Sequence, residues 1–201
     1  MACHVKGLEL PGYEPRALKA MAVGLAVGAR GADHNRSGAY EEDFRAGADR
    51  LADDERKGAA AATTETRAAI LDSLILCKFL RGVFDDLEGE AATMLSAVTG
   101  WDVSRDALVA TGERIATLKK LFNVREGWTP AEDTLPGRFL DEGLGGESEA
   151  AGARLRAQDL ARMIRTYYRA RGWTDGGDVP PETLARLDLE DAPTGLGAPT
   201  R

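Results

Sequence analysis

The chain of 201 residues has only two cysteines and two histidines, and this scarcity limits the metal chemistry that it can support alone. Cys3 and Cys77 cannot form a disulfide framework. Two thiols also cannot supply the four thiolates of an iron–sulfur cluster or close a structural zinc site. Any cluster or metal bound here must therefore take ligands from elsewhere.

Long apolar segments and an excess of basic residues are also missing. Residues 1–16 lack the apolar region of a signal peptide. The longest apolar run, residues 17–29, is too short to span a bilayer and contains Lys19. The net charge of −7 argues against nucleic acid or an anionic membrane as the main partner. We therefore expect a cytoplasmic protein with neither a nucleic-acid partner nor a membrane partner.

Aromatic residues make up only 6% of the chain, and no segment has the alternating pattern of a strand. Alanine and glycine are abundant, which favours close helix packing. The sequence predicts an all-α domain of about six or seven helices over residues 1–190. Residues 191–201 are rich in proline and glycine and are predicted to form a disordered tail. The expected helices cover residues 17–28, 40–57, 63–80, 83–99, 104–122 and 155–171, with Thr63 or Thr64 as one cap and Pro181 beginning a last short helix.

The segment Asp72-Ser-Leu-Ile-Leu-Cys77 places an ionisable acid and a thiol on an otherwise apolar helical stretch. A buried carboxylate costs several kcal/mol unless it finds a donor. Asp72 therefore needs a structural partner or a ligand that offers N–H groups. On a continuous helix, Cys77 lies about 140° from Asp72 around the axis. If the helix ends between them, both side chains can face one ligand.

Both residues also have simpler interpretations. A lone cysteine in an apolar run is usually a small buried hydrophobic residue. An aspartate near a helix start is usually a cap or a surface charge.

Residues 30–40 form a second segment of concentrated polar chemistry, predicted to be a loop. His34 lies between glycines and can donate a proton near neutral pH. Asn35 and Arg36 can bind carboxylate or phosphate oxygens. The alternative is a surface loop with a solvated histidine.

Further motifs follow in order along the chain. Val5-Lys-Gly-Leu-Glu-Leu-Pro-Gly-Tyr-Glu-Pro-Arg16 comes first, followed by the two segments above. After them come Thr99-Gly-Trp-Asp102, Gly112-Glu-Arg-Ile115, Phe122-Asn-Val-Arg-Glu-Gly127, Asp133-Thr-Leu-Pro136 and Tyr167-Tyr-Arg-Ala-Arg-Gly-Trp173. Together, over residues 5–190, they resemble the C-terminal domain of the tungsten-containing aldehyde ferredoxin oxidoreductases. Residues 30–40 are similar to that family's RG-x-x-H segment, and residues 72–77 to its D-x-x-G-L-C motif.

The resemblance implies a role for each of four residues. Cys77 would be the fourth ligand of a [4Fe–4S] cluster whose other thiolates come from a middle domain. Asp72 would accept hydrogen bonds from a pterin of a tungsten bis-molybdopterin cofactor, and Leu76 would pack its backbone against that pterin. His34 would lie near the tungsten as a proton donor or as a partner of the substrate oxygen.

The implied function is that of the C-terminal part of an oxidoreductase. Such an enzyme oxidises a small aldehyde to a carboxylic acid and passes electrons to ferredoxin. This chain is expected to be inactive without the N-terminal domains or a subunit that carries them. The aldehyde, the choice between tungsten and molybdenum, and the formation of a homodimer stay open. The alternative is a non-catalytic helical assembly module or a gene remnant.

Ile75 departs from the family motif, which has glycine at this position. A β-branched residue does not readily adopt a positive φ. We therefore expect the turn to differ here and to hold a pterin slightly farther away.

Overall fold

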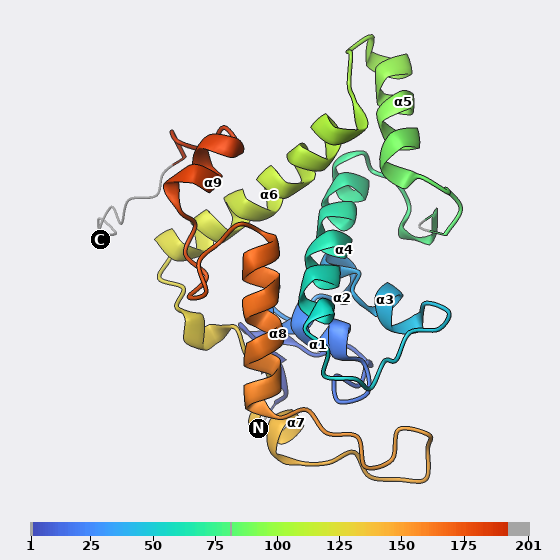
Figure 1. Cartoon of the computed structure of the whole chain (residues 1–201), viewed down its shortest axis with the longest axis vertical. Helices are drawn as coiled ribbons and strands as arrows, with labels where there is room; N and C mark the ends of the chain where they lie inside the picture. Colours follow the sequence, from blue (N-terminus) through green and yellow to red (C-terminus); the bar gives the residue numbers. More distant parts are fainter. Residues whose placement is uncertain (1, 81, 193–201) are drawn as a thin grey trace.

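The computed structural model describes residues 2–80 and 82–192, and the fold is all-α as predicted (Figure 1). The described residues also form the 3-10 turns Lys78–Leu80 and Pro130–Glu132 and an antiparallel ribbon of β1 (His4–Val5) and β2 (Leu8–Glu9). Residues 193–201 of the predicted tail lie outside the described residues. The helices are α1 (Lys19–Val27), α2 (His34–Ser37), α3 (Tyr40–Phe44), α4 (Arg56–Ser73), α5 (Leu87–Thr99), α6 (Arg105–Arg125), α7 (Gly137–Asp141), α8 (Ala157–Ala170) and α9 (Pro181–Arg186).

The described part of the chain has more helices than expected, because the single turns α2 and α7 were not predicted. The helix predicted over residues 40–57 was too long, since α3 covers only its first five residues. Helices of four or five residues are too short to produce a helical period in the sequence. The expected boundaries of α4 were also wrong. Thr63 and Thr64 lie inside this helix, where their hydroxyls donate to the preceding carbonyls of Ala59 and Ala61.

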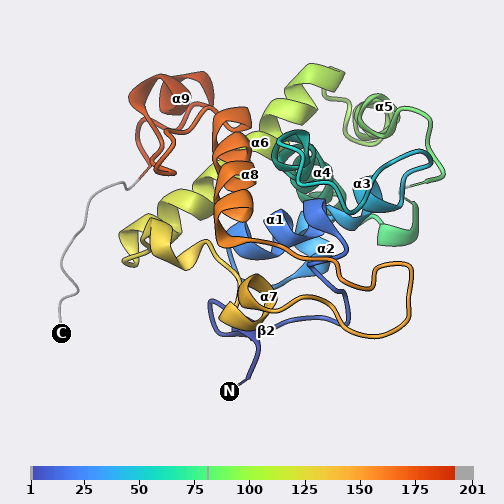
Figure 2. The same cartoon turned by 60° about the horizontal axis from the view of Figure 1, so that its bottom comes forward.

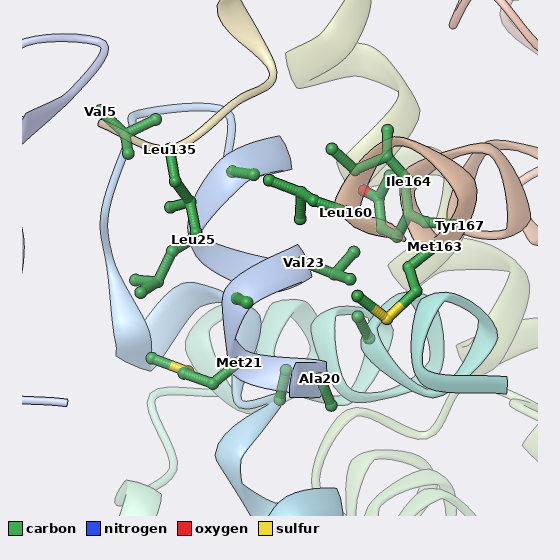
Figure 3. Packing of buried hydrophobic residues seen from close by; sticks show 14 of the residues in the cluster. Val5, Ala20, Met21, Val23, Leu25, Leu135, Leu160, Met163, Ile164 and Tyr167 are labelled. Carbon is green, nitrogen blue, oxygen red and sulfur yellow. The ribbon is translucent and has the colours of Figure 1, made fainter. Parts of the chain in front are cut away.

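Helix α1 lies at the centre of the main core and is buried along nearly its whole length. Such a helix is apolar on all sides because neighbours cover it all round. Helices α4 and α8 pack against it, and Figure 3 shows the side chains gathered between α1 and α8. Gly24 lets α2 approach closely, since a Cβ atom there would lie 2.5 Å from the Ser37 hydroxyl oxygen. The central members of this core are Met21, Val23, Leu25, Leu160 and Met163.

Two smaller clusters hold the outer helices, which lie at opposite sides of α4 and α8 (Figures 1 and 2). Helix α5 packs on α6 and on the end of α4 through Ile70, Ala91 and Leu108. The segment around α9 packs on α6 through Leu121 and Leu187. No helix in the described part of the chain is long and apolar enough to cross a membrane.

Candidate cofactor-binding groove

Helix α4 ends in a Schellman turn, and this turn sets the geometry of the Asp72–Cys77 segment. The N–H of Leu76 donates to the carbonyl of Leu71 at 2.9 Å, and the N–H of Ile75 donates to that of Asp72 at 3.3 Å. The helix therefore ends between Asp72 and Cys77, so the rotation expected for a continuous helix does not apply.

Ile75 occupies the left-handed position of this turn, with a φ of 56°. Glycine usually fills that position because it has no Cβ atom. The expectation that a β-branched residue would avoid a positive φ here is therefore wrong. Its side chain is 92% exposed and meets no packed neighbour that would prevent this. The strain of such a conformation is about 1–2 kcal/mol.

Cys77 is a free, exposed thiol just beyond this turn. The interpretation of Cys77 as a small buried hydrophobic residue is therefore wrong. Large apolar residues before and after it in the sequence are also exposed, with Ile75 at 92%, Phe79 at 94% and Val83 at 67%. Within residues 75–80 and 82–83, an exposed thiol thus lies among exposed apolar residues.

Asp72 has structural partners in the folded chain. Its side chain is 23% exposed, and one carboxylate oxygen lies 2.6 Å from the Lys78 ammonium. The other carboxylate oxygen pairs with the guanidinium of Arg36, which comes from α2. Helix α2 lies beside α4 (Figures 1 and 2). Lys78 and Arg36 therefore supply the hydrogen-bond donors that the partly buried Asp72 carboxylate needs.

His34 begins α2, a single helical turn within the segment that was predicted to be a loop. Asp33 caps this turn by accepting from the N–H groups of Asn35 and Arg36 at 2.9 and 3.2 Å. The imidazole of His34 is half-buried, with its centre 5.3 Å from the Tyr13 ring and 6.3 Å from the Tyr40 ring. These two rings fix its position, so His34 is not a freely solvated side chain.

A groove runs over α2, α4 and α6 and brings His34 and Asp72 together. One part, of about 460 Å³, is lined by His34, Asp72 and Lys78 among others. A second part, of about 370 Å³, lies between α4 and α6 and has apolar walls. Both parts share Arg30, Arg36 and Asp72, so we treat them as one groove. Leu76 and Cys77 are not among its lining residues and follow Asp72 on the adjoining turn. The second part is lined mainly by Ala29, Glu65, Ala69, Ala116, Lys119, Phe122 and Asn123.

The sequence analysis did not assign a role to Asp133, which is the centre of a buried polar network. Its carboxylate lies 2.6 Å from the Lys6 ammonium and 3.6 Å from that of Lys120. It also accepts from the Trp128 indole at 3.0 Å and from the Tyr168 hydroxyl. Asp133, Lys6 and Tyr168 all lie in the ordered motifs. Their place in these motifs was the only sign in the sequence that they have a role.

Burial controls the protonation of this network. It lowers the pKa of Lys120 to about 8, although the Asp133 carboxylate opposes the shift. The Lys120 ammonium lies 2.7 Å from the centre of the Trp128 ring. Burial raises the pKa of the Tyr168 phenol, and the charge of Asp133 adds to this effect. Tyr168 therefore stays protonated and donates to Asp133.

Glu65 lies between the groove and the buried side chains of Tyr167 and Arg171. Its carboxylate accepts from the Tyr167 hydroxyl and from the Arg171 guanidinium, both on the C-terminal half of the chain. Burial raises the pKa of Tyr167 well above its ordinary value, with the charge of Glu65 adding to it. Glu65 also lines the groove, so one side chain faces both regions.

Comparison with known proteins assigns the chain to a family. The family model described as "Aldehyde ferredoxin oxidoreductase, domains 2 & 3" matches residues 1–189. The chain belongs to the aldehyde ferredoxin oxidoreductase family. The resemblance found in the ordered motifs is thereby confirmed over nearly the whole chain.

Tungsten-containing aldehyde ferredoxin oxidoreductases of three archaea are similar to this chain. The identity is 34% for Pyrococcus horikoshii, 33% for Pyrococcus furiosus and 32% for Thermococcus kodakarensis, over 93% of this chain in each case. The match covers 30%, 31% and 31% of these relatives, respectively. The chain thus spans less than a third of the length of each relative.

Proposed function

We propose that this chain is the C-terminal part of a tungsten-pterin, iron–sulfur oxidoreductase. The enzyme would oxidise small aldehydes to carboxylic acids, pass the electrons to ferredoxin and work in the cytoplasm. The main support is the groove that holds His34 and Asp72 beside the exposed thiol of Cys77, in a member of the aldehyde ferredoxin oxidoreductase family. Because the chain spans less than a third of its relatives, it would be inactive alone.

Asp72 is suited to bind a pterin. A carboxylate has about four lone-pair sites, and Lys78 and Arg36 engage one oxygen each. Acceptor capacity is therefore left for the ring N–H and amino groups of a pterin. The partly exposed carboxylate opens onto the groove, so a ligand reaches it without unfolding the turn. Leu76 would support the same ligand through the backbone of the turn. When bound, the pterin would supply ligands to the tungsten and a route for electrons.

Cys77 is suited to complete a cluster that another polypeptide or domain begins. Within residues 2–80 and 82–192, no three His, Cys, Asp or Glu side chains are grouped to hold a metal. A single exposed thiol would supply one ligand of a [4Fe–4S] cluster, and the remaining ligands would come from outside this chain. The exposed apolar residues Ile75, Phe79 and Val83 fit a surface that such a neighbour covers.

His34 is suited to hold a proton near the reacting oxygen. Its imidazole lines the groove, and Tyr13 and Tyr40 restrict its orientation. An imidazole N–H can donate to an oxygen of the substrate. The restricted ring reduces the reorganisation needed for that transfer.

The experiment is co-expression with a polypeptide that carries the remainder of the family architecture. We expect a complex with tungsten, about four irons per heterodimer and aldehyde oxidation. His34→Ala should keep the metals and lose the activity, whereas His4→Ala should keep both. Metal analysis also decides between tungsten and molybdenum.

A complex that assembles without tungsten or molybdenum would contradict the proposal. A chain that is stable alone and joins no such polypeptide would favour the alternative, a non-catalytic helical module or a gene remnant.

A further inference from the structure

A small cavity lies behind the groove, between α4, α6 and α8. Its volume for water-sized occupants is about 10 Å³. It shares Ala29, Glu65, Ala116 and Asn123 with the groove, so these residues form the wall between the two spaces. On its inner side it is lined by Lys6, Lys120, Trp128, Tyr167 and Trp173.

Trp173 is an unexplained feature of this cavity. The residue is 6% exposed, and its indole N–H has no hydrogen-bond partner in the described structure. A buried donor without an acceptor costs about 1–3 kcal/mol. Buried indole N–H groups usually find a partner. The cavity that Trp173 lines is where such an acceptor has room.

The cavity has the size and the polar wall of a water site. A space of about 10–15 Å³ on this measure holds one water molecule, provided that two to four polar groups surround it. Trp173 and Lys120 offer donors, and the carboxylate of Glu65 offers an acceptor. Asn123 donates its amide N–H to the Ala29 carbonyl at 2.6 Å, which leaves its amide oxygen as a second acceptor. Two donors and two acceptors match the hydrogen-bonding capacity of one water.

We propose that this cavity holds one ordered water molecule, which accepts a hydrogen bond from the Trp173 indole and joins Lys120 to Glu65. Glu65 also lines the groove, so the water extends the hydrogen-bond network of the groove to the network around Asp133. The two buried networks, centred on Glu65 and on Asp133, then become one. This inference does not rest on the proposed function, because it uses only the wall of the cavity.

The test is NMR of the whole chain with nitrogen-15 in its tryptophans. The chain has three tryptophans, so three indole N–H signals are expected, and Trp101→Phe and Trp128→Phe assign them. The Trp173 indole should show a cross-peak to water with the sign of a bound, slowly tumbling water. The Trp128 indole is half-buried, donates to Asp133 and lines the same cavity, so its signal serves only to assign the spectrum.

The neighbouring Tyr167 hydroxyl could relay magnetisation from bulk water, so Tyr167→Phe is the control variant. The cross-peak should persist in this variant. Its absence in the wild-type chain, or its loss in Tyr167→Phe, would overturn the proposal. Crystals of the chain give an independent measurement. Density for one oxygen within hydrogen-bond distance of the Trp173 indole nitrogen supports the water site, and an empty cavity contradicts it.

Discussion

Asp133 and Asp72 are both carboxylates paired with two cations, yet their surroundings differ. Asp133 is 2% exposed at its side chain and receives Lys6, Lys120, Trp128 and Tyr168. Asp72 is 23% exposed and pairs with Arg36 and Lys78 at the edge of the groove. The donors around Asp133 use its acceptor capacity, whereas Asp72 keeps part of its own. Two of the motifs therefore contribute different carboxylates: Asp133 is buried in the fold, whereas Asp72, at the edge of the groove, is the one proposed to bind a ligand.

The largest contrast is expected from removing each carboxylate. Asp133→Ala leaves buried cations without their partner, which should lower the free energy of unfolding by about 3–5 kcal/mol. Asp72→Ala breaks partly exposed pairs and should cost less than about 1 kcal/mol. Urea unfolding of both variants measures the difference, with Asp141→Ala on the surface of α7 as a control. Equal losses of unfolding free energy in Asp133→Ala and Asp72→Ala would show that the two carboxylates do not differ in their contribution to stability.

The pH dependence of the unfolding free energy tests the protonation of the buried Lys120. Burial lowers the pKa of Lys120 to about 8, below its ordinary value of about 10.4. Between these values the unfolded chain binds more protons than the folded one, so this group makes stability rise with pH. From about pH 8 to about pH 9.5 the rise should be about 1.5 kcal/mol larger in the wild-type chain than in Lys120→Met.

Unfolding free energies of the two proteins at both pH values measure this difference. The same rise in the wild-type chain and in Lys120→Met would show that Lys120 is not the titrating group.

The smallest expected effect concerns the turn. Ile75→Gly should stabilise the chain by about 0.5–1 kcal/mol, because the strain relieved exceeds the added freedom of the unfolded glycine. Little packing is lost, since the Ile75 side chain is almost fully exposed. Thermal or urea unfolding measures the change.

The matched control is Val98→Gly, another exposed β-branched residue, which lies inside α5 and should destabilise the chain. If Ile75→Gly destabilised the chain as much as Val98→Gly does, the strain at Ile75 would be refuted.

The long helices could be predicted from the sequence because their apolar residues recur at helical spacing. The end of α4 could not, since Ile75 is a residue type that rarely adopts the left-handed conformation. Predicting the site required both the sequence motifs and the packing of the helices. The ordered motifs indicated His34 and Asp72, but the pairing of Asp72 with Arg36 depends on α2 packing beside α4. Asp133 was missed as a centre because its partner Lys6 comes from the opposite end of the chain, where no local pattern connects them.

The proposed role of Cys77, just beyond the turn that ends α4, is to supply one ligand of an iron–sulfur cluster. Its most direct test is the iron content of the assembled enzyme with Cys77→Ser, compared with Cys3→Ser. We predict that the Cys77→Ser enzyme loses the cluster, which holds about four irons. The free energy of unfolding of the chain should change by less than about 0.5 kcal/mol. Cys3→Ser should keep the iron. Full iron content in Cys77→Ser would contradict the account.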